Sequence, residues 1–333
     1  MKLILQRVVN KKRKVSISTL FFILFTLLAS VVFSPAALAA DAAIELLSKM
    51  NQAVQTQNYR MYFLTQEKDQ YVTTYEYSHL GSQQNDRYAH LLYLEGPAKE
   101  IILHNGVTSY FQPDSTSFSI SSSRITEAFP DVIYNNFNEL SDSYDFVLIG
   151  KTRTANRTAQ LVRIVAKDKD RYSYVIWIDD ETHLPIRIDL TDLNNELVQQ
   201  IKVIELDSNF DKKKMKDYIN TRNYPILLAI EKQDDELDNW HLLWLPKGFK
   251  EIAAYNVSFY SDDIATKLYS DGVFSFTVNI SDENIKQSDE VIQQGARTIF
   301  STHVANKNVV IIGNLPLTTI EQIARNIAEK PPQ

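Results

Sequence analysis

Hydrophobic and polar residues alternate along most of the chain between residues 59 and 209, which is the pattern of half-buried β-strands. In the clearest segment, 171–179, Tyr172, Tyr174 and Ile176 fall on the same face of an extended chain. Short polar turns join consecutive strands, so an antiparallel meander is predicted. The candidate strands cover residues 59–66, 70–79, 86–94, 99–104, 107–112, 144–154, 158–166, 171–179, 186–191 and 196–206. A sheet of this size curls to bury its apolar face, and holds either its own side chains or an apolar ligand.

Helical periodicity is found in two places, one before the first strand and one between strands. Residues 41–57 repeat their apolar residues at helical spacing, and Asp41 can serve as the N-cap. A weaker helical stretch covers roughly residues 123–140. Residues 207–226 are dense in charge and lack an apolar period, which predicts a linker or an exposed helix.

A second, smaller unit begins near Tyr224, and a helix closes it. Thr318 and Glu321 have capping-box spacing at the start of that helix, and Ile327 extends its apolar stripe. The strands before it are expected near residues 251–257, 266–270, 273–281, 296–304 and 307–312. The prediction is an α+β chain with a large, bent antiparallel sheet and helices at 41–208, a linker at 209–224, and a small antiparallel sheet covered by a helix at 225–330.

The N-terminus resembles a secretory signal peptide over residues 1–39. Six basic residues and no acidic one precede an apolar run at 15–33, and Ala37-Leu38-Ala39 follows with the small-residue cleavage pattern. The alternative is an uncleaved membrane anchor, because a run of this length can span a bilayer. Cleavage near Ala39 would place the mature protein in an export compartment. The chain has no Cys, so disulfides cannot stabilise it there.

The charge of the mature chain argues against nucleic acid as a partner. The whole sequence has a net charge of −6, and removing the six positive charges of the leader gives −6 − 6 = −12. A chain this acidic repels the phosphate backbone of DNA and RNA.

The sequence offers no catalytic or metal-binding pattern. None of the six His residues lies within four positions of another, no thiol is present, and no common hydrolase motif occurs. Asp179, Asp180 and Glu181 resemble the paired carboxylates of glycosidases, but they fall in a predicted turn, where Asp is favoured by local hydrogen bonds. We therefore predict a protein that is not an enzyme and uses no cofactor.

Two aromatic segments are candidates for binding. Tyr172, Tyr174 and Trp177, with the adjacent Arg171, either pack within the sheet or line a cavity or partner groove. The segment 268–276 is read as a hairpin with its turn at Asp271 and Gly272. A ring on each side of that turn could contact a partner, and the predicted partner-binding residues are Tyr269, Ser270, Asp271, Gly272 and Phe274.

Several stretches, taken in order, resemble the RseB/MucB family. The strongest runs from Asp170 to Leu190, and includes Asp170-Arg171-Tyr172-Ser173-Tyr174 and Leu184-Pro185-Ile186-Arg187. The second unit contributes Trp244-Leu245-Pro246-Lys247-Gly248-Phe249 and Leu268-Tyr269-Ser270-Asp271-Gly272. No single motif is decisive, but their order and spacing over residues 44–328 are specific.

The resemblance implies a fold and a function. The first domain would be a half-open β-barrel similar to LolA and LolB. The protein would bind the periplasmic part of a membrane anti-sigma factor of the RseA/MucA type and shield it from a site-1 protease of the DegS type. Lipopolysaccharide or a related envelope lipid would relieve this inhibition. From the aromatic strand itself, Arg171, Tyr172, Tyr174 and Trp177 are the predicted lipid- or partner-binding residues. The alternative is a periplasmic carrier of lipid or lipoproteins. Monomer and homo-oligomer both remain open.

Overall fold

The computed structural model describes residues 35–81, 87–228, 231–232, 240–259, 262–282 and 289–329. Most of the predicted leader, residues 1–34, lies outside this part of the chain. Within it, no helix combines the length and the apolar character needed to cross a membrane.

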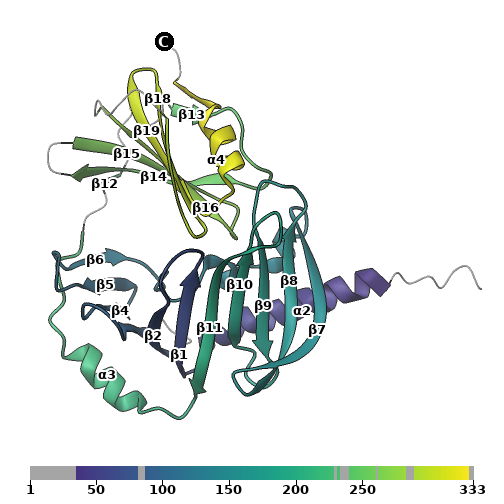
Figure 1. The fold of residues 1–333 in the computed structure, drawn as a ribbon. Helices are drawn as coiled ribbons and strands as arrows, with labels where there is room; N and C mark the ends of the chain where they lie inside the picture. Colours follow the sequence, from purple (N-terminus) through teal and green to yellow (C-terminus); the bar gives the residue numbers. More distant parts are fainter. Residues whose placement is uncertain are drawn as a thin grey trace, which may run out of the picture. The chain divides into compact units, whose positions relative to one another are not determined.

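An eleven-stranded antiparallel sheet forms the first domain, in the order β6-β5-β4-β3-β2-β1-β11-β10-β9-β8-β7 (Figure 1). The first and last strands therefore pair in the middle of the sheet, with Arg60 opposite Asp207. Each other neighbouring pair is consecutive in sequence, as the meander predicts. The strands are β1 (Tyr59–Glu67), β2 (Thr73–Leu80), β3 (Tyr88–Tyr93), β4 (Glu100–His104), β5 (Val107–Phe111), β6 (Phe118–Ser121), β7 (Tyr144–Thr154), β8 (Arg157–Ala166), β9 (Ser173–Asp179), β10 (Pro185–Thr191) and β11 (Leu197–Asp207).

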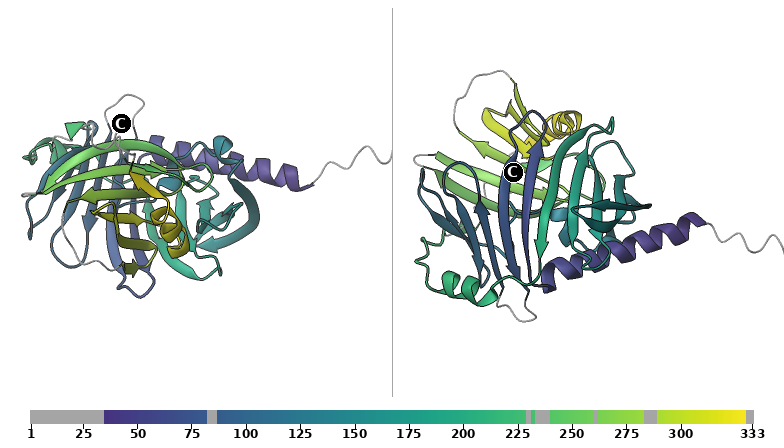
Figure 2. Two further views of the ribbon diagram at one scale, coloured as in Figure 1. Left: turned by 90° about the horizontal axis from the view of Figure 1, so that it is seen from above. Right: turned by 60° about the horizontal axis from the view of Figure 1, so that its bottom comes forward.

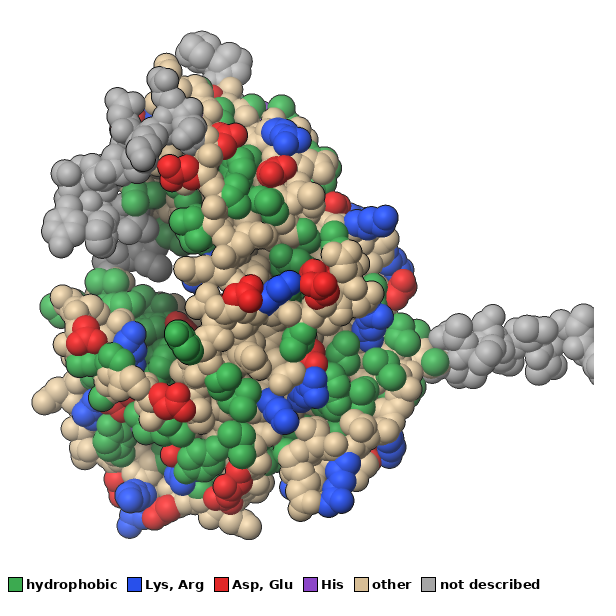
Figure 3. Space-filling view, in the orientation of Figure 1, with side chains coloured by type: hydrophobic (Ala, Val, Ile, Leu, Met, Phe, Trp, Pro, Cys, Tyr) green, Lys and Arg blue, Asp and Glu red, His purple; other side chains and the backbone are tan. Residues whose placement is uncertain are grey.

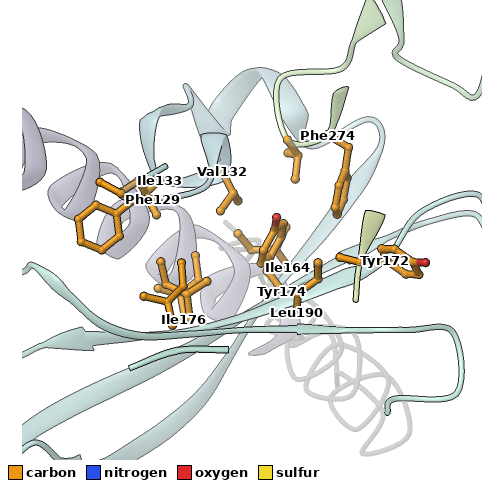
Figure 4. Packing of buried hydrophobic residues seen from close by; sticks show 14 of the residues in the cluster. Phe129, Val132, Ile133, Ile164, Tyr172, Tyr174, Ile176, Leu190 and Phe274 are labelled. Atoms are coloured by element: carbon orange, nitrogen blue, oxygen red, sulfur yellow. The ribbon is translucent and has the colours of Figure 1, made fainter. Parts of the chain in front are cut away.

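Helix α2 (Pro35–Thr56) lies along one face of this sheet, as Figure 2 shows for the part after Ala39. Its residues Leu47, Met50 and Val54 are buried in one cluster with side chains of the sheet. Figure 4 shows Phe129, Val132 and Ile133 of the neighbouring segment meeting Ile176 of β9 in the same core. Aliphatic and aromatic side chains therefore fill the inner face of the sheet.

Two predictions for the helices of this domain were wrong. Helix α2 begins at Pro35, so Asp41 lies inside the helix and is not its N-cap. The stretch 123–140 forms two short 3-10 turns, η1 (Asp131–Tyr134) and η2 (Phe137–Leu140), instead of a longer helix. Pro130 explains the difference, because the residue before a proline is sterically disfavoured in the helical region.

The predicted linker contains helix α3 (Lys212–Asn220). Asp211 caps it by accepting a hydrogen bond from the backbone N–H of Lys214 at 2.9 Å. One side of α3 is buried, because Met215 and Ile219 pack in a small cluster with Leu80, Tyr88, Ile102 and Phe210 of the first domain.

The second domain has a seven-stranded antiparallel sheet in the order β12-β14-β15-β16-β19-β18-β17. Helix α4 (Leu317–Ala324) packs on it through Ile320 and Ile323, which share a core with Phe276 and Ile311. The strands are β12 (Glu231–Lys232), β14 (Lys250–Phe259), β15 (Asp262–Ser270), β16 (Ser275–Ser281), β17 (Glu290–Gln294), β18 (Arg297–Val304) and β19 (Lys307–Gly313), and a separate pair is formed by β13 (Trp240–Leu242) and β20 (Ile327–Glu329).

The end of this domain corrects two further predictions. The N-cap of α4 is Pro316, with no capping bond from a side chain, so Thr318 and Glu321 do not form a capping box. Ile327 belongs to β20 and not to the helical stripe, because the chain leaves the helix after Ala324 to pair with β13. The predicted α+β class, with a large antiparallel sheet and a smaller one covered by a helix, is confirmed.

Candidate functional site

The two predicted binding segments meet in a buried polar contact. Arg171 lies two residues before the start of β9, while Asp271 lies a hundred residues later in the turn between β15 and β16. The Arg171 Nη1 lies 2.7 Å from Asp271 Oδ2, and the exposed fractions of the two side chains are 0% and 1%. The first domain is therefore joined to the second by an ion pair that is shielded from water.

Asp271 holds its own turn as well as this ion pair. Its Oδ1 accepts hydrogen bonds from the backbone N–H groups of Val273 and Phe274, at 2.9 and 2.8 Å. Its Oδ2 accepts a bond from the Tyr144 hydroxyl at 2.5 Å in addition to that from Arg171. An Asp whose carboxylate caps its own turn is typical of such loops, so the Asp-Gly turn that the sequence predicts also presents the carboxylate to the other domain.

The guanidinium of Arg171 is surrounded by acceptors and rings. It is bound by Asp168 of the preceding loop, and it lies 5.0 Å from the ring centroid of Tyr144 and 5.7 Å from that of Phe249. Burial, followed by the charge of Asp271, raises the pKa of Tyr144 far above its usual range, so that its hydroxyl stays protonated and can donate. Charge pairing and cation–π contact together compensate the removal of Arg171 from water.

An aromatic stack lies beside the ion pair. The rings of Tyr174 and Phe274 are stacked with centroids 5.3 Å apart and planes inclined by 16°. Figure 4 shows Phe274 approaching Tyr174 from the other domain, with Tyr172 nearby. Offset stacking of buried rings contributes beyond their area alone, so this stack is a second tie between the domains. We call the contacts of Arg171, Asp271, Tyr144, Tyr174 and Phe274 the junction.

The remaining predicted residues lie around the junction or away from it. Tyr269 is buried inside the second domain, where it stacks on Phe276 and its hydroxyl donates to Glu251. Ser270 donates to the Phe274 carbonyl. Trp177 lies on the opposite face of β9 from Tyr174, under the guanidinium of Arg187, and so is not part of the junction.

Sequence reasoning missed several hydrogen bonds that complete the junction. Asn135 donates to the carbonyl of Gly272 at 2.5 Å, and its own carbonyl accepts from Asn51 of α2 at 3.1 Å. Thr319 of α4 donates to the Asp170 carbonyl at 3.0 Å. These are ordinary polar residues in loops and helix ends, and nothing in the sequence pairs them.

The buried state of these residues bears on the predicted partner contacts. Phe274 and Tyr269 are 3% and 4% exposed, so the chain itself covers both rings. A partner would reach them only if the junction opened. Partner or lipid binding by the predicted residues therefore stays a prediction, while their meeting in one place is observed.

An open groove of about 460 Å³ runs beside the junction. This volume lies within the usual range of small-molecule sites, roughly 300–1,000 Å³. Trp244 and Leu245 form its apolar part, and burial followed by the charge of Asp168 raises the pKa of Asp170 at its wall. The other lining residues are Asp142, Ser143, Lys167, Asp168 and Lys247.

A smaller pocket of about 110 Å³ lies between α2 and the sheet. Val54, Tyr77 and Leu103 contribute its apolar wall, and Arg87 and Arg124 its basic one. Across the described ranges, no group of three or more His, Asp or Glu side chains is arranged to hold a metal ion.

Because His79 is buried at this pocket, we expect the protein to lose stability in mild acid. Burial lowers its pKa to about 4, and its Nδ1 lies 3.0 Å from the carbonyl of Gln57. In the unfolded chain the pKa of a His is near 6.5. Between that pH and about 4, His79 is therefore protonated in the unfolded state and neutral in the folded state. Stability should fall as the pH drops from about 6.5 to about 4, by up to about 3 kcal/mol from this residue.

The measurement is urea unfolding at several pH values for the wild type and His79→Gln, which keeps a donor for the Gln57 carbonyl. The variant should lose less stability on acidification than the wild type. Equal losses in the two proteins would show that His79 does not cause the effect.

Gly272 should not tolerate a side chain. Its φ of +94° is rarely adopted by other residues, and an added Cβ would lie 2.8 Å from Asn135 Oδ1. We expect Gly272→Ala to cost at least about 1 kcal/mol of stability, because it adds backbone strain and displaces the side chain of Asn135. Thermal unfolding would test this, with Gly106→Ala as the control, since Gly106 also has a positive φ, +77°, but open space around its Cβ. Equal losses in both variants would mean that the contact with Asn135 contributes nothing.

The fold and the junction define a class of protein: a large and a smaller antiparallel sheet, each with a helix packed on it, tied together by a buried ion pair and an aromatic stack. Residues 42–226 match the MucB/RseB N-terminal domain, and residues 234–328 match the MucB/RseB C-terminal domain. The chain therefore belongs to the MucB/RseB family of sigma-E and AlgU regulatory proteins, and the resemblance predicted from the sequence is confirmed. These are regulators and not enzymes, as the sequence also predicts.

Relatives of known name and solved structures align with this chain over most of its length. The sigma-E factor regulatory protein RseB of Escherichia coli K12 is 35% identical over 92% of this chain and 97% of its own length. RseB of Haemophilus influenzae is 37% identical over 86% and 91%. The complex structure of Pseudomonas aeruginosa MucA/MucB aligns with a TM-score of 0.70 at 20% identity, over 87% of this chain and 100% of that chain. A crystal structure of MucB in complex with MucA(peri) aligns with a TM-score of 0.69 over the same shares.

Proposed function

We propose that this protein is a periplasmic regulator that binds the periplasmic segment of a membrane anti-sigma factor of the RseA/MucA type. The observation that carries the proposal is the match of both domains, in order, to a family in which MucB has been solved with MucA. The junction supports it physically, because a tied pair of domains presents a partner with one preorganised surface. Preorganisation lowers the entropic cost of binding an extended segment.

The groove beside the junction is the surface we assign to this segment. It is lined by residues of both domains, including Lys167 of the first and Trp244 of the second. Indole and aliphatic side chains suit an apolar anchor residue, and the mixed Lys and Asp residues suit a polar peptide backbone and its charges.

Shielding from a site-1 protease of the DegS type follows if the bound segment contains the cleavage site. A protease needs its substrate extended in its own active site, and a segment held on this protein cannot be in both places. With purified components, adding the wild-type protein should slow cleavage of the anti-sigma segment. A cleavage rate that does not change at saturating protein would remove this part of the proposal.

A further part of the proposal is that an envelope lipid such as lipopolysaccharide releases the anti-sigma segment. Lipid binding in the first domain would require part of that domain to move. The pocket of about 110 Å³ under α2 is well below the roughly 300–1,000 Å³ of ordinary ligand sites. An acyl chain would therefore have to displace α2 or the segment from Phe129 to Phe137, which now fills the sheet. Titrating lipopolysaccharide into the preformed complex would test this by the release of a labelled segment. Release should depend weakly on salt if acyl burial dominates, and steeply if charge does.

The periplasmic location is proposed from the family and from the leader predicted at residues 1–39. Mass spectrometry of protein taken from the periplasm should find a new N-terminus at Ala40 or within a few residues of it. Mature protein that still begins at Met1 would identify residues 15–33 as a membrane anchor instead.

A pull-down from envelope extract separates this function from that of a lipid or lipoprotein carrier. A regulator should recover one inner-membrane anti-sigma factor, and a carrier should recover many lipoproteins. Recovery of lipoproteins without an anti-sigma factor would favour the carrier.

A further inference from the structure

The segment that connects the two domains carries an unusual concentration of positive charge. Between residues 211 and 222 the chain has five basic residues and two acidic ones, so the segment has a charge of 5 − 2 = +3 in a protein of net charge −6. Met215 and Ile219 anchor α3 to the first domain, which turns Lys212, Lys213 and Lys214 toward solvent. Among the residues that the structure describes, these three lysines form no ion pair, so their charges are available to a partner.

Exposed apolar side chains continue along the same edge. Ile226, Leu227 and Leu228 are 82%, 49% and 50% exposed. Tyr218 and Tyr224 are 40% and 38% exposed. Three consecutive exposed aliphatic residues are uncommon on a protein surface without a binding role.

The backbone holds these aliphatic side chains in place. The N–H of Ser119 in β6 donates to the Ile226 carbonyl at 2.9 Å, and the N–H of Leu228 donates to the Ser119 carbonyl at 2.8 Å. The Tyr224 hydroxyl donates to the Ile219 carbonyl at the end of α3 at 2.8 Å. The helix and the extended segment are therefore fixed on one domain, and little conformational entropy remains to be lost on binding.

We propose that this edge, formed by α3 and residues 224–228, docks on the surface of an anionic lipid bilayer. Lysines near a membrane surface are attracted to anionic headgroups, aliphatic side chains enter the interfacial region, and Tyr is favoured at its boundary. Along this edge, Figure 3 shows basic and hydrophobic side chains, with some acidic ones, where Figure 1 draws α3 and β6. The inference is independent of the anti-sigma partner, and would orient the regulator against the membrane.

The net negative charge of the whole protein sets the expected salt dependence. A bilayer of anionic lipid repels the chain as a whole, while the lysines of α3 act only within a Debye length, about 8 Å at physiological ionic strength. Binding should therefore be of short range and should weaken steeply with salt. Three lysines near the surface together contribute about 100-fold in partitioning.

The test is co-sedimentation of the purified protein with vesicles of phosphatidylcholine alone and of an equal mixture of phosphatidylcholine and phosphatidylglycerol. The wild type should sediment with the mixed vesicles at low ionic strength and not with the neutral ones. The partitioning of the charge variant onto the mixed vesicles should fall by about 100-fold or more. A control variant with the same change in net charge, made at exposed lysines elsewhere, should partition within about threefold of the wild type. The charge variant is Lys212→Glu, Lys213→Glu and Lys214→Glu, and its control is Lys169→Glu, Lys202→Glu and Lys250→Glu.

A second pair of variants tests the apolar part. Serine at the three exposed aliphatic positions of the edge should also weaken sedimentation, whereas serine at three exposed aliphatic residues elsewhere should not. The edge variant is Ile226→Ser, Leu227→Ser and Leu228→Ser, and its control is Leu193→Ser, Leu197→Ser and Ile204→Ser. Equal losses in an edge variant and its control, or equal sedimentation with neutral and anionic vesicles, would overturn the proposal. A wild-type protein that stays in the supernatant with both kinds of vesicle would also overturn the proposal. The edge would then be a candidate surface for a protein partner.

Discussion

Replacing Arg171 with alanine is expected to lower the free energy of unfolding by about 3–5 kcal/mol. The substitution leaves Asp271 buried beside the Tyr144 hydroxyl without its cation, and removes the guanidinium that lies over the rings of Tyr144 and Phe249. Removing one partner of a buried ion pair costs far more than the pair contributes net, because the remaining charge has lost its compensation. Urea unfolding at neutral pH measures the loss.

Two control variants make this test specific. Arg153→Ala removes an exposed arginine that donates to the Asn156 side chain, and should change stability by less than about 0.5 kcal/mol. Arg171→Met combined with Asp271→Asn removes both charges and keeps an amide oxygen that can accept from the N–H groups of Val273 and Phe274, so it should recover part of the loss. If Arg171→Ala were no more destabilising than Arg153→Ala, the ion pair would not hold the domains together.

Phe274→Ala should also cost about 3–5 kcal/mol, the usual range for a buried phenylalanine. Its ring is 3% exposed, and it stacks on Tyr174 of the other domain. Loss of the ring leaves a cavity at the junction, because Tyr174 is held in β9 and cannot move far enough to fill it.

A double-mutant cycle separates this contact from ordinary core packing. Tyr174→Ala and Phe274→Ala should show a coupling energy of about 0.5–1.5 kcal/mol. Phe276 provides the matched control, since it is equally buried and stacks on Tyr269 at 5.1 Å, within the second domain alone. Tyr174→Ala and Phe276→Ala should combine additively, and a coupling as large as that with Phe274 would mean that the stack does not specifically link the domains.

The sequence predicts the strands of this protein well because their alternation is local. The strand pattern at 171–179 and the turn at Asp271 and Gly272 both depend on residues within one hairpin, and both are found in the structure. Strand β17 was not predicted, since its five residues are all exposed and show no alternation of buried and open positions. The stretch at 123–140 has helical spacing, but Pro130 divides it, and tertiary packing then decides its shape.

The junction was predicted only in part. Arg171 and Asp271 were each identified as binding residues, yet nothing in the sequence indicates that they bind each other, because contacts across a hundred residues leave no local pattern. A charged side chain is also expected at the surface, and its burial becomes visible only when its partners are known. The aromatic pair shows the same limit: alternation separates Tyr174 from Trp177, but does not tell which of the two faces another domain.

The measurement that tests the central claim most directly is a calorimetric titration of this protein with the periplasmic segment of the anti-sigma factor from the same organism. We predict saturable binding with one segment per chain and a Kd in the micromolar range or tighter. Phe274→Ala should weaken binding at least about tenfold, or about 1.4 kcal/mol, because it loosens the junction beside the groove, and Arg153→Ala should leave binding unchanged. A folded wild-type protein that shows no saturable binding to the segment would contradict the account.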